Sequence, residues 1–457
     1  MKQKLSITML MISLSCMAFA GGIVTNSNQS AQYVRMLARD ASTSIDAVYY
    51  NPAGLTKLAD GFHFYLSNQS VFQKKTIENS YPYLNEKKYV GDVVVPAYPD
   101  FYFAYKKEKL AIGFGFQPNA GGGSAKYDTG LPSFEIPYAS LPATLSAMYG
   151  AGFCTEYSAD IQFEGSSVFW GAQLNASYAV TDIISASLGA RMILAKNTYK
   201  GHIKDIMINP QHAVINPSGG LMSASQFFTQ AGNATYAAMT SDQEVDVTQT
   251  GTGYTPILGV NLNFNDKLNI GLKYEFRTKL ELENDTKKDL VVPQFTDGAK
   301  IRSDIPALLS VGARYAVLPQ LRISGGIHYF FDKDATIEKA PGVKKEIDGN
   351  MYELSVGGEY DITDKILISA GYLYAKTGVG TGYQTDLSHS LTSSTVGFGG
   401  EFKVTEKLDL NLGMLYTMYT SDARNGSYTM ATTQVVSYKE TYNRTNIDFS
   451  IGIGYHF

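Results

Sequence analysis

Long stretches of this chain alternate apolar and polar residues with a period of two, the pattern of β-strands whose two faces meet different environments. The clearest stretch, 267–277, sets Leu268, Ile270, Leu272, Tyr274 and Phe276 against Asn269, Gly271, Lys273, Glu275 and Arg277. The alternation recurs at 366–374, 408–417 and 447–457. In a soluble sandwich the apolar face would form the core, whereas in a membrane barrel it would face lipid and the polar face would line the lumen.

The connections between these strands are of two kinds. Short polar turns lie at Lys106–Lys109, Thr181-Asp182, Asn265-Asp266, Pro319-Gln320, Thr363-Asp364 and Thr405-Glu406. Longer segments alternate with them, at roughly 77–95, 119–165, 200–250, 284–304, 335–349, 378–390 and 422–440. Six turns join six pairs of strands, and one strand before and one after bring the number to fourteen. An even number with short turns at one end and long loops at the other is typical of a bacterial outer-membrane barrel. We therefore expect a 14-stranded antiparallel transmembrane β-barrel over 61–457, whose longest extracellular loops are about 119–165 and 200–250.

Composition excludes several other classes of protein. With 38 basic and 42 acidic residues the net charge is −4, which offers no basic surface for nucleic acid. The mean hydropathy is −0.12, and no long apolar run follows the first twenty residues, which argues against a bundle of membrane-spanning helices. The six histidines are scattered, and no catalytic-triad order, His-Glu-x-x-His motif or paired cysteines appear, so we expect no enzyme, no metal and no cofactor. An outer-membrane hydrolase is the less favoured alternative, with His328 beside Ser324 as the histidine to test.

The first twenty residues have the organisation of a cleaved signal peptide. Lys2 and Lys4 form a basic head, an apolar stretch follows, and Ala18-Phe19-Ala20 provides a small-x-small cleavage site. A membrane anchor and a lipoprotein modified at Cys16 are the alternatives. Export through a signal peptide places the mature chain in the outer membrane of a Gram-negative cell if the barrel prediction is right.

The last strand, 447–457, alternates apolar and polar residues and ends on Phe457. A strand of this kind resembles the signal by which outer-membrane barrels reach their assembly machinery, which would make that machinery a partner. An ordinary final strand that closes a sheet is the alternative. We expect a monomer surrounded by outer-membrane lipid.

The segment 21–60 lacks the alternation and carries helical spacing at 31–40. It predicts a small helical region before the barrel, either a periplasmic extension or a plug (hatch) inside the lumen, which a barrel of this size can hold. It ends in the motif Asn51, Pro52, Ala53, Gly54, in which Asn-Pro favours a turn.

The run Asp40–Leu55, placed after a signal peptide and before fourteen strands, resembles the start of the FadL/TodX family of outer-membrane transporters for long-chain fatty acids and aromatic hydrocarbons. The resemblance implies that 21–60 is a hatch and that the protein is a passive channel for hydrophobic molecules. It further implies capture of the ligand on extracellular loops, transfer to a lumenal pocket near the mature N-terminus at Gly21-Gly22-Ile23, and lateral exit at a kinked strand near the hatch. A general porin or a structural outer-membrane barrel is the alternative function.

The third strand supplies the candidates for that lateral gap. Leu110–Phe116 runs into Gln117-Pro118-Asn119 and then into three glycines, and Pro and Gly can interrupt the hydrogen bonding of a ladder. The candidates are Phe116, Pro118 and Asn119. The alternative is that Pro118 simply begins the following loop.

Two further sets of residues are candidates for ligand contact. The long loops are unusually apolar, and Met with Phe suits flexible alkyl chains, although loops that pack only on each other would look the same. The loop candidates are Leu141, Leu145, Met148, Tyr149, Leu221, Met222, Phe227 and Phe228. A carboxylate headgroup would need a lumenal cation, although most such cations would be paired with acids such as Glu275, Glu359 and Glu401. The cation candidates are Arg191, Lys273, Arg277, Arg314 and Arg322.

Overall fold

The computed structural model describes residues 23–265, 267–288 and 295–457. The predicted signal peptide and the Gly21-Gly22 pair lie outside the described residues. No helix among the described residues is long and apolar enough to cross a membrane.

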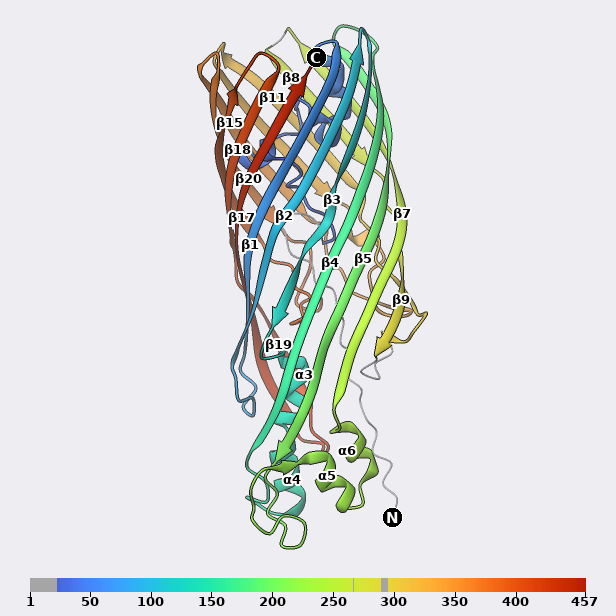
Figure 1. Ribbon diagram of the computed structural model, residues 1–457, viewed down its shortest axis with the longest axis vertical. Helices are drawn as coiled ribbons and strands as arrows, with labels where there is room; N and C mark the ends of the chain where they lie inside the picture. The colour runs from blue at the N-terminus through green and yellow to red at the C-terminus, as the bar shows by residue number, and fades with distance from the viewer. Residues whose placement is uncertain (1–22, 266, 289–294) are drawn as a thin grey trace.

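The described strands form a closed antiparallel barrel of fourteen spans, which confirms the predicted fold (Figure 1). Strand β1 closes the barrel by pairing with β20, from His63↔His456 to Asn79↔Glu440. The spans are β1 (Gly61–Asn79), β2 (Lys88–Lys107), β3 (Leu110–Tyr127), β4 (Tyr157–Ala179), β5 (Ile184–Ile208), β7 (Gln243–Phe264), β8 (Leu268–Glu275) with β9 (Glu281–Lys288), β10 (Lys300–Arg302) with β11 (Leu308–Leu318), β12 (Leu321–Phe330), β15 (Tyr352–Thr363), β16 (Ile366–Lys376), β17 (Ser393–Lys403), β18 (Leu408–Tyr419) with β19 (Asp422–Thr429), and β20 (Val435–His456). Short strands β6 (Met222–Ser223), β13 (Glu338–Ala340) and β14 (Val343–Lys344) lie in the connections.

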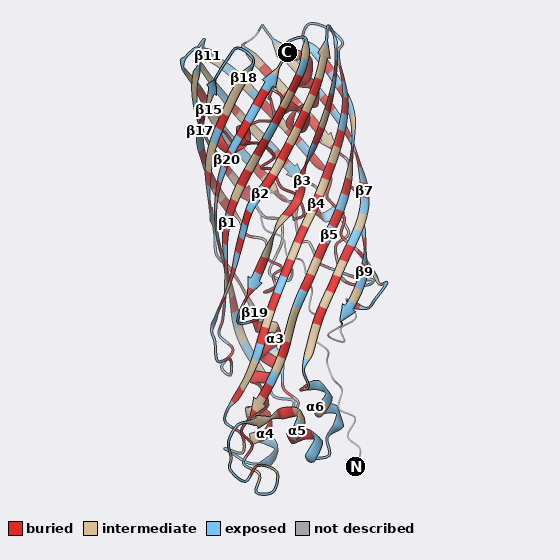
Figure 2. Cartoon of the chain, viewed as in Figure 1, coloured by how far each residue is buried: buried red, intermediate tan, exposed pale blue. Residues whose placement is uncertain are grey.

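The two faces of the strands are reversed relative to a soluble protein. Along β8 the polar residues Asn269, Lys273 and Glu275 are buried, while the apolar residues between them are partly exposed. Leu188 of β5 is 66% exposed, whereas Asn261 of β7 is 0% exposed. The same alternation of buried and exposed residues runs along every long strand in Figure 2. Polar residues inside and apolar residues outside are what a membrane barrel requires, so the soluble sandwich is excluded.

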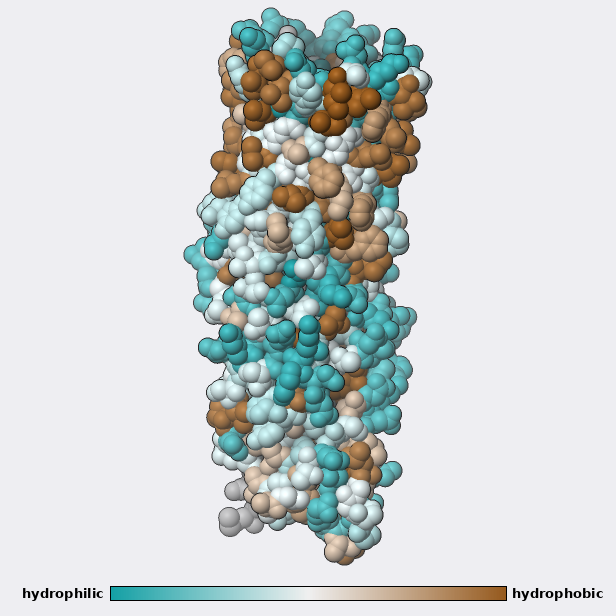
Figure 3. Space-filling model, turned by 90° about the vertical axis from the view of Figure 1, so that its left-hand side faces the viewer, coloured by the Kyte–Doolittle hydropathy of each residue, from teal (hydrophilic) through white to brown (hydrophobic). Residues whose placement is uncertain are grey.

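The apolar outer surface is a band, not a complete coat. Figure 3 shows hydrophobic side chains gathered around the end of the barrel that carries the short turns and the C-terminus, and hydrophilic side chains nearer the middle. Strands such as β5, with 25 residues, are more than twice as long as the roughly ten residues that cross a membrane. The barrel therefore extends well beyond the membrane on the long-loop side.

This extension explains why several strand ends differ from the sequence prediction. The segments 77–95 and 422–440 are mostly strand, with only 80–87 and 430–434 left as turns between strands. The connections expected at about 119–165 and 200–250 are reduced to 128–156 and 209–242. Outside the membrane the outward side chains are polar and several inward ones are apolar, as with Asp246 and Val247 of β7, so the alternation that marks a membrane strand does not continue there.

The connections at the long-loop end contain the remaining helices. The β3–β4 connection folds into α3 (Pro132–Ala139) and α4 (Leu141–Tyr149), and the β5–β7 connection into α5 (Ala224–Gln230) and α6 (Ala234–Met239). A single turn, η3 (Asp332–Asp334), follows β12. In Figure 1 helices α3 to α6 stand toward the far end of the molecule from the C-terminus.

The N-terminal segment lies inside the barrel and not beside it. It contains α1 (Ala31–Arg35), α2 (Ala47–Tyr50) and the 3-10 helix η1 (Pro52–Lys57), drawn in dark blue within the ring of strands in Figure 1. Helix α1 packs against β16, β17, β18, β20 and β1, whereas η1 packs against β2, β3, β4, β5, β7 and β8. The segment thus bridges opposite walls of the lumen, and a periplasmic extension does not describe it.

Candidate functional site

The motif at 51–54 fastens the hatch to the barrel wall. Asn51 is fully buried, and its Nδ2 donates hydrogen bonds to the Ser42 carbonyl at 2.9 Å and to Asn261 Oδ1 at 2.7 Å. Pro52 is the first residue of η1, where its fixed φ suits a helix start, and its carbonyl accepts from Ser177 Oγ at 2.7 Å. The motif therefore joins the hatch to itself and to strands β4 and β7.

Small residues allow this close approach. A Cβ on Gly54 would lie 2.4 Å from the Ser42 carbonyl oxygen, and Ala53 is fully buried against the wall. A Cβ on Gly271 of β8 would lie 2.1 Å from the Asp40 carbonyl oxygen. Gly54 thus lets the hatch fold closely on itself, and Gly271 lets the wall meet the hatch backbone to backbone.

A second fastening joins the hatch to β12 and β15. His328 Nε2 lies 2.6 Å from Asp40 Oδ1, and its Nδ1 lies 2.7 Å from Glu353 Oε2. Ser27 Oγ also donates to Glu353, at 3.0 Å. Because both ring nitrogens face carboxylates, His328 has no nitrogen left to activate a serine nucleophile.

Strand β3 is broken at the candidate gap residues. Its ladder with β2 jumps from Phe101↔Phe116 to Val93↔Ala125, so 94–100 and 117–124 take no part in that pairing. Opposite, β3 bulges against β4 at 118–120 and again at 121–123, where Gly121 has φ +66° and Gly122 φ +120°. These angles favour glycine and allow the strand to turn inward. The alternative that Pro118 merely begins a loop does not hold, since β3 continues to Tyr127.

Donor groups from the hatch and from β2 form hydrogen bonds with backbone carbonyl groups of the broken segment of β3. The Pro118 carbonyl accepts from Tyr98 Oη at 2.6 Å and from Gln29 Nε2 at 3.1 Å. The Asn119 carbonyl accepts from the Asn26 backbone N–H at 3.0 Å, and Asn26 Nδ2 donates to the Gly121 carbonyl at 2.7 Å. The beginning of the hatch is therefore held directly across the break.

The outer side of the break carries an aromatic pair. Phe116 is 38% exposed, and its ring stacks on that of Trp170 at 5.1 Å with an interplanar angle of 4°. Trp170 lies opposite Pro118 in the β3–β4 ladder and is the only tryptophan in the chain. This pair faces the lipid side of the kinked strand.

Two of the candidate cations are fully engaged within the protein. Arg191 donates to both carboxylate oxygens of Glu275, at 2.6 and 3.1 Å, and Lys273 Nζ lies 2.7 Å from Glu275 Oε1. Both cations also lie over the Tyr49 ring of the hatch, at 4.8 and 4.5 Å from its centroid. Both cations are buried, and through these contacts they hold the hatch in place.

The other three candidate cations lie elsewhere. Arg277 follows the end of β8, where the alternation stops, and it is exposed and donates to the Asp334 carbonyl, so the inward position expected for it is wrong. Arg322 forms a bidentate pair with Asp361, at 2.5 and 2.8 Å. Arg314, partly buried on β11, and Arg322 both line a cavity at the short-turn end.

The candidate loop residues divide between a core and a surface. Leu141, Leu145, Phe227 and Phe228 are buried, whereas Met148, Tyr149 and Leu221 are exposed and Met222 is half-buried. The rings of Phe153 and Phe227 connect the two loops, with centroids 6.3 Å apart. The loops therefore pack on each other and also present an apolar tip.

The interior between these loops and the hatch is apolar over most of its length. An outer cluster of buried residues runs from the loop helices along the long-loop ends of the strands and includes Phe134, Phe163, Tyr199 and Tyr442. An inner cluster then gathers around Ile23 and Val24 and includes Ala120 of the broken strand and Tyr383. The start of the described chain thus lies in an apolar region beside the kink.

Three basic residues that were not among the predicted candidates lie where these two clusters meet. Lys345 is buried, its Nζ has no hydrogen-bond partner among the described residues, and it lies 4.5 Å from the centroid of the Tyr383 ring. Arg444 lies 5.1 Å from the centroid of the Tyr419 ring and donates to the His389 carbonyl at 3.1 Å, while its Nε has no partner among the same residues. The His389 ring stacks on Tyr442, with centroids 4.9 Å apart. We call Lys345, His389 and Arg444 the cation cluster.

Burial and neighbouring cations disfavour the charged forms of Lys345 and His389. Burial, with a smaller contribution from Lys339, lowers the pKa of Lys345 to about 7. Burial lowers the pKa of His389 well below its ordinary value, and Arg444, Lys75 and Lys345 lower it further. Buried positive groups with unused donors are unfavourable unless an anion joins them.

Only one member of the cation cluster had a signal in the sequence. Arg444 lies on the polar face of the last strand, in step with Asn446 and Asp448. Lys345 and His389 lie in irregular connections, 345–351 and 377–392, where no periodicity indicates which way a side chain points. Among the described residues no group of three or more His, Cys, Asp or Glu is placed to hold a metal ion.

Comparison with solved structures identifies similar folds. A FadL homologue of Pseudomonas aeruginosa has a TM-score of 0.67 at 13% identity, covering 96% of this chain and 100% of the other. The toluene transporter TodX of Pseudomonas putida has a TM-score of 0.61 at 15% identity, covering 96% and 100%. The toluene transporter TbuX of Ralstonia pickettii has a TM-score of 0.54 at 16% identity, covering 91% and 94%. At these identities the likeness concerns the fold alone.

Sequence comparison identifies the family. No curated protein matches the chain significantly. A family model described as "Outer membrane protein transport protein (OMPP1/FadL/TodX)" matches residues 147–457, which is more than half of the chain. Together with the closed barrel and its internal hatch, this match supports location in the outer membrane and a role in transport. The chain belongs to the OMPP1/FadL/TodX family of outer membrane transport proteins.

Proposed function

We propose that this protein is a passive channel for long-chain fatty acids, and that it recognises their carboxylate in the lumen. The observation that carries the proposal is the cation cluster at the junction of two apolar clusters. An alkyl chain fits the apolar walls, and a carboxylate supplies the negative charge that Lys345 and Arg444 lack. A neutral hydrocarbon would leave these donors unused, so the geometry favours a fatty acid over toluene-like ligands.

The path begins at the long-loop end. Met148, Tyr149 and Leu221 form an exposed apolar tip on which an alkyl chain can be captured. From there the outer apolar cluster leads to the cation cluster and then to the region around Ile23. Each step exchanges one apolar contact for another, so the movement needs no energy source.

The proposed exit is lateral, through the break in β3. Between this level and the short-turn end, the hatch fills the lumen and is fastened to both walls. This arrangement disfavours a straight passage to the periplasm. At the break, the beginning of the hatch and Tyr98 supply hydrogen bonds to β3 in place of the missing ladder. Moving 26–29 away from Pro118 and Asn119 would open a path between β2 and β3 toward lipid.

The competing functions fit these observations less well. A general porin needs an open aqueous lumen, whereas this lumen is occupied by a hatch and by apolar clusters. A hydrolase centred on His328 would need a free ring nitrogen, and both nitrogens face carboxylates. We therefore retain the transporter as the proposal.

The test compares a charged ligand with a neutral one of equal length. Purified protein in detergent is titrated with oleate and with oleyl alcohol, for the wild type, for Lys345→Met, and for Lys344→Met as a neighbouring exposed control. We expect Lys345→Met alone to weaken oleate binding while oleyl alcohol binds as before. Equal binding of oleate by all three proteins would contradict carboxylate recognition by Lys345.

A further inference from the structure

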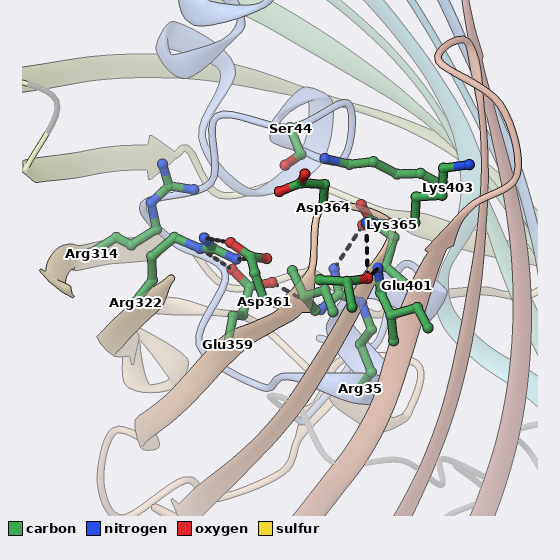
Figure 4. Close-up of a pocket in the computed structure, with 13 residues that line it drawn as sticks. Arg35, Ser44, Arg314, Arg322, Glu359, Asp361, Asp364, Lys365, Glu401 and Lys403 are labelled. Atoms are coloured by element: carbon green, nitrogen blue, oxygen red, sulfur yellow. Dashed lines mark hydrogen bonds and ion pairs between the residues drawn. The ribbon is translucent and has the colours of Figure 1, made fainter. Parts of the chain in front are cut away.

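A second cavity, separate from the apolar path, opens at the short-turn end of the barrel. Its volume is about 280 Å³, and it lies between Ser44 of the hatch and strands β11, β12, β15, β16 and β17 (Figure 4). Of its thirteen lining residues, only Ile366 and Leu367 are apolar. A cavity of this composition suits a small polar ligand and not an alkyl chain.

Most of the acids around this cavity already have cationic partners. Glu359 lies 2.8 Å from Arg35 Nη1 and 3.4 Å from Arg39 Nη1. Glu401 lies 3.1 Å from Arg35 Nη2, and Asp361 accepts the bidentate pair from Arg322. Dashed lines in Figure 4 mark the interactions among those of these residues that line the cavity, Arg39 not being drawn. Their charges are therefore largely compensated within the protein.

The remaining lining charges are predominantly positive. Arg314, Lys365 and Lys403 line the cavity, and the charged side-chain groups of these three residues form no ion pair or hydrogen bond with the residues that the structure describes. Against these three cations stands one lining acid without an ion pair among those residues, Asp364. Arg314 is partly buried on β11, and Figure 4 shows it beside Arg322 with no dashed line reaching it. A guanidinium in this position presents a planar set of donors suited to two oxygens of an anion.

We propose that this cavity is an oxyanion-binding site in which Arg314 is the principal ligand-binding residue, assisted by Lys365 and Lys403. The ligand is a carboxylate or a phosphate, bound next to the hatch at the short-turn end of the barrel, which is its periplasmic mouth. The site does not depend on the proposed fatty-acid path, because it contains none of the residues of the cation cluster or of the broken strand.

The probe for this site is inorganic phosphate. Line broadening of its ³¹P NMR signal is followed as detergent-solubilised full-length protein is added, in a detergent without phosphorus. The variants are Arg314→Gln, Arg314→Lys and Lys107→Gln, the last being an exposed lysine at the same end of the barrel that does not line the cavity. We expect the wild type and Lys107→Gln to broaden the signal equally, and Arg314→Gln to weaken phosphate binding by about tenfold or more. Arg314→Lys should recover part of this loss.

Controls and competition complete the test. Heat-modifiable migration of the barrel on gels verifies that each variant is folded. Acetate and octanoate are then added as competitors: equal competition identifies a site for any small oxyanion, whereas competition by octanoate alone assigns the site to a transported amphiphile. Absence of broadening with the folded wild type, or equal broadening by folded Arg314→Gln, would overturn the proposal and leave the fatty-acid path untouched.

Discussion

Replacing Lys345 by Met removes the one ammonium of the cation cluster that lacks any hydrogen-bond partner among the described residues. Its pKa of about 7, against an ordinary 10.5, corresponds to roughly 5 kcal/mol for keeping the ammonium charged in the empty site. A bound carboxylate would recover part of this free energy, and a charge-assisted hydrogen bond contributes about 1.5–3 kcal/mol. We therefore expect Lys345→Met to weaken oleate binding by roughly 10- to 150-fold.

The same lysine predicts how binding depends on pH. Below pH 7 the ammonium is already protonated in the empty site, whereas above pH 7 a proton must be taken up when the carboxylate binds. Oleate affinity should therefore fall as pH rises above about 7, by up to about tenfold per pH unit. His389, whose pKa lies well below 6.5, stays neutral over this range and adds no further step.

Isothermal titration calorimetry in two buffers of different ionisation enthalpy measures both the affinity and the proton uptake. Lys345→Met should lose the pH dependence, and because it removes a buried ammonium without a partner, its thermal unfolding temperature should be unchanged or higher. Tight oleate binding by the variant, or proton uptake equal to that of the wild type, would refute the reasoning.

Three further predictions concern the hatch and the broken strand. Asn51→Ala removes two buried hydrogen bonds and should destabilise the hatch by about 1–3 kcal/mol, measured as faster amide hydrogen exchange over the hatch with the barrel strands unchanged; unaltered exchange would contradict the fastening role. Gly271→Ala places a Cβ 2.1 Å from the Asp40 carbonyl oxygen and should loosen the hatch in the same assay, whereas a stabilised hatch would show that the close contact is unimportant. A disulfide between Asn26→Cys and Asn119→Cys, whose backbones are joined by a 3.0 Å hydrogen bond, should block fatty-acid uptake by cells without weakening oleate binding, and a reductant should restore uptake. Uptake by the oxidised variant at the normal rate would exclude exit at this position.

The sequence was sufficient to predict the barrel, because the main signal of a barrel strand is the alternation of apolar outward and polar inward residues. That alternation is strongest within the membrane. The turns at one end, such as 319–320, were placed correctly for the same reason. The outer ends of the strands were not, because there the pattern is the opposite of that within the membrane: at the start of β7 Glu244 and Asp246 point outward, while Val245 and Val247 are buried inside.

The candidate site was harder to predict, because pairing between charges is a three-dimensional property. Alternation correctly directed Arg191 and Lys273 inward, but it could not show that Glu275 engages both. Lys345 and His389 lie in irregular connections whose course depends on the packing of several loops. Proline and glycine spacing did mark the segment in which β3 leaves its ladder, since those residues act locally.

The central claim, that the ligand leaves sideways through the break in β3, can be measured with Trp170. This single tryptophan stacks on Phe116 and lies opposite Pro118, so its fluorescence reports on the proposed exit. The protein in lipid nanodiscs, carrying the cysteines at 26 and 119, is mixed with dibrominated stearate, which quenches tryptophan on contact. Direct partition of the fatty acid into lipid gives a background phase that is the same in the oxidised and reduced protein. The account predicts an additional rapid quenching phase only after reduction; identical quenching traces before and after reduction would contradict it.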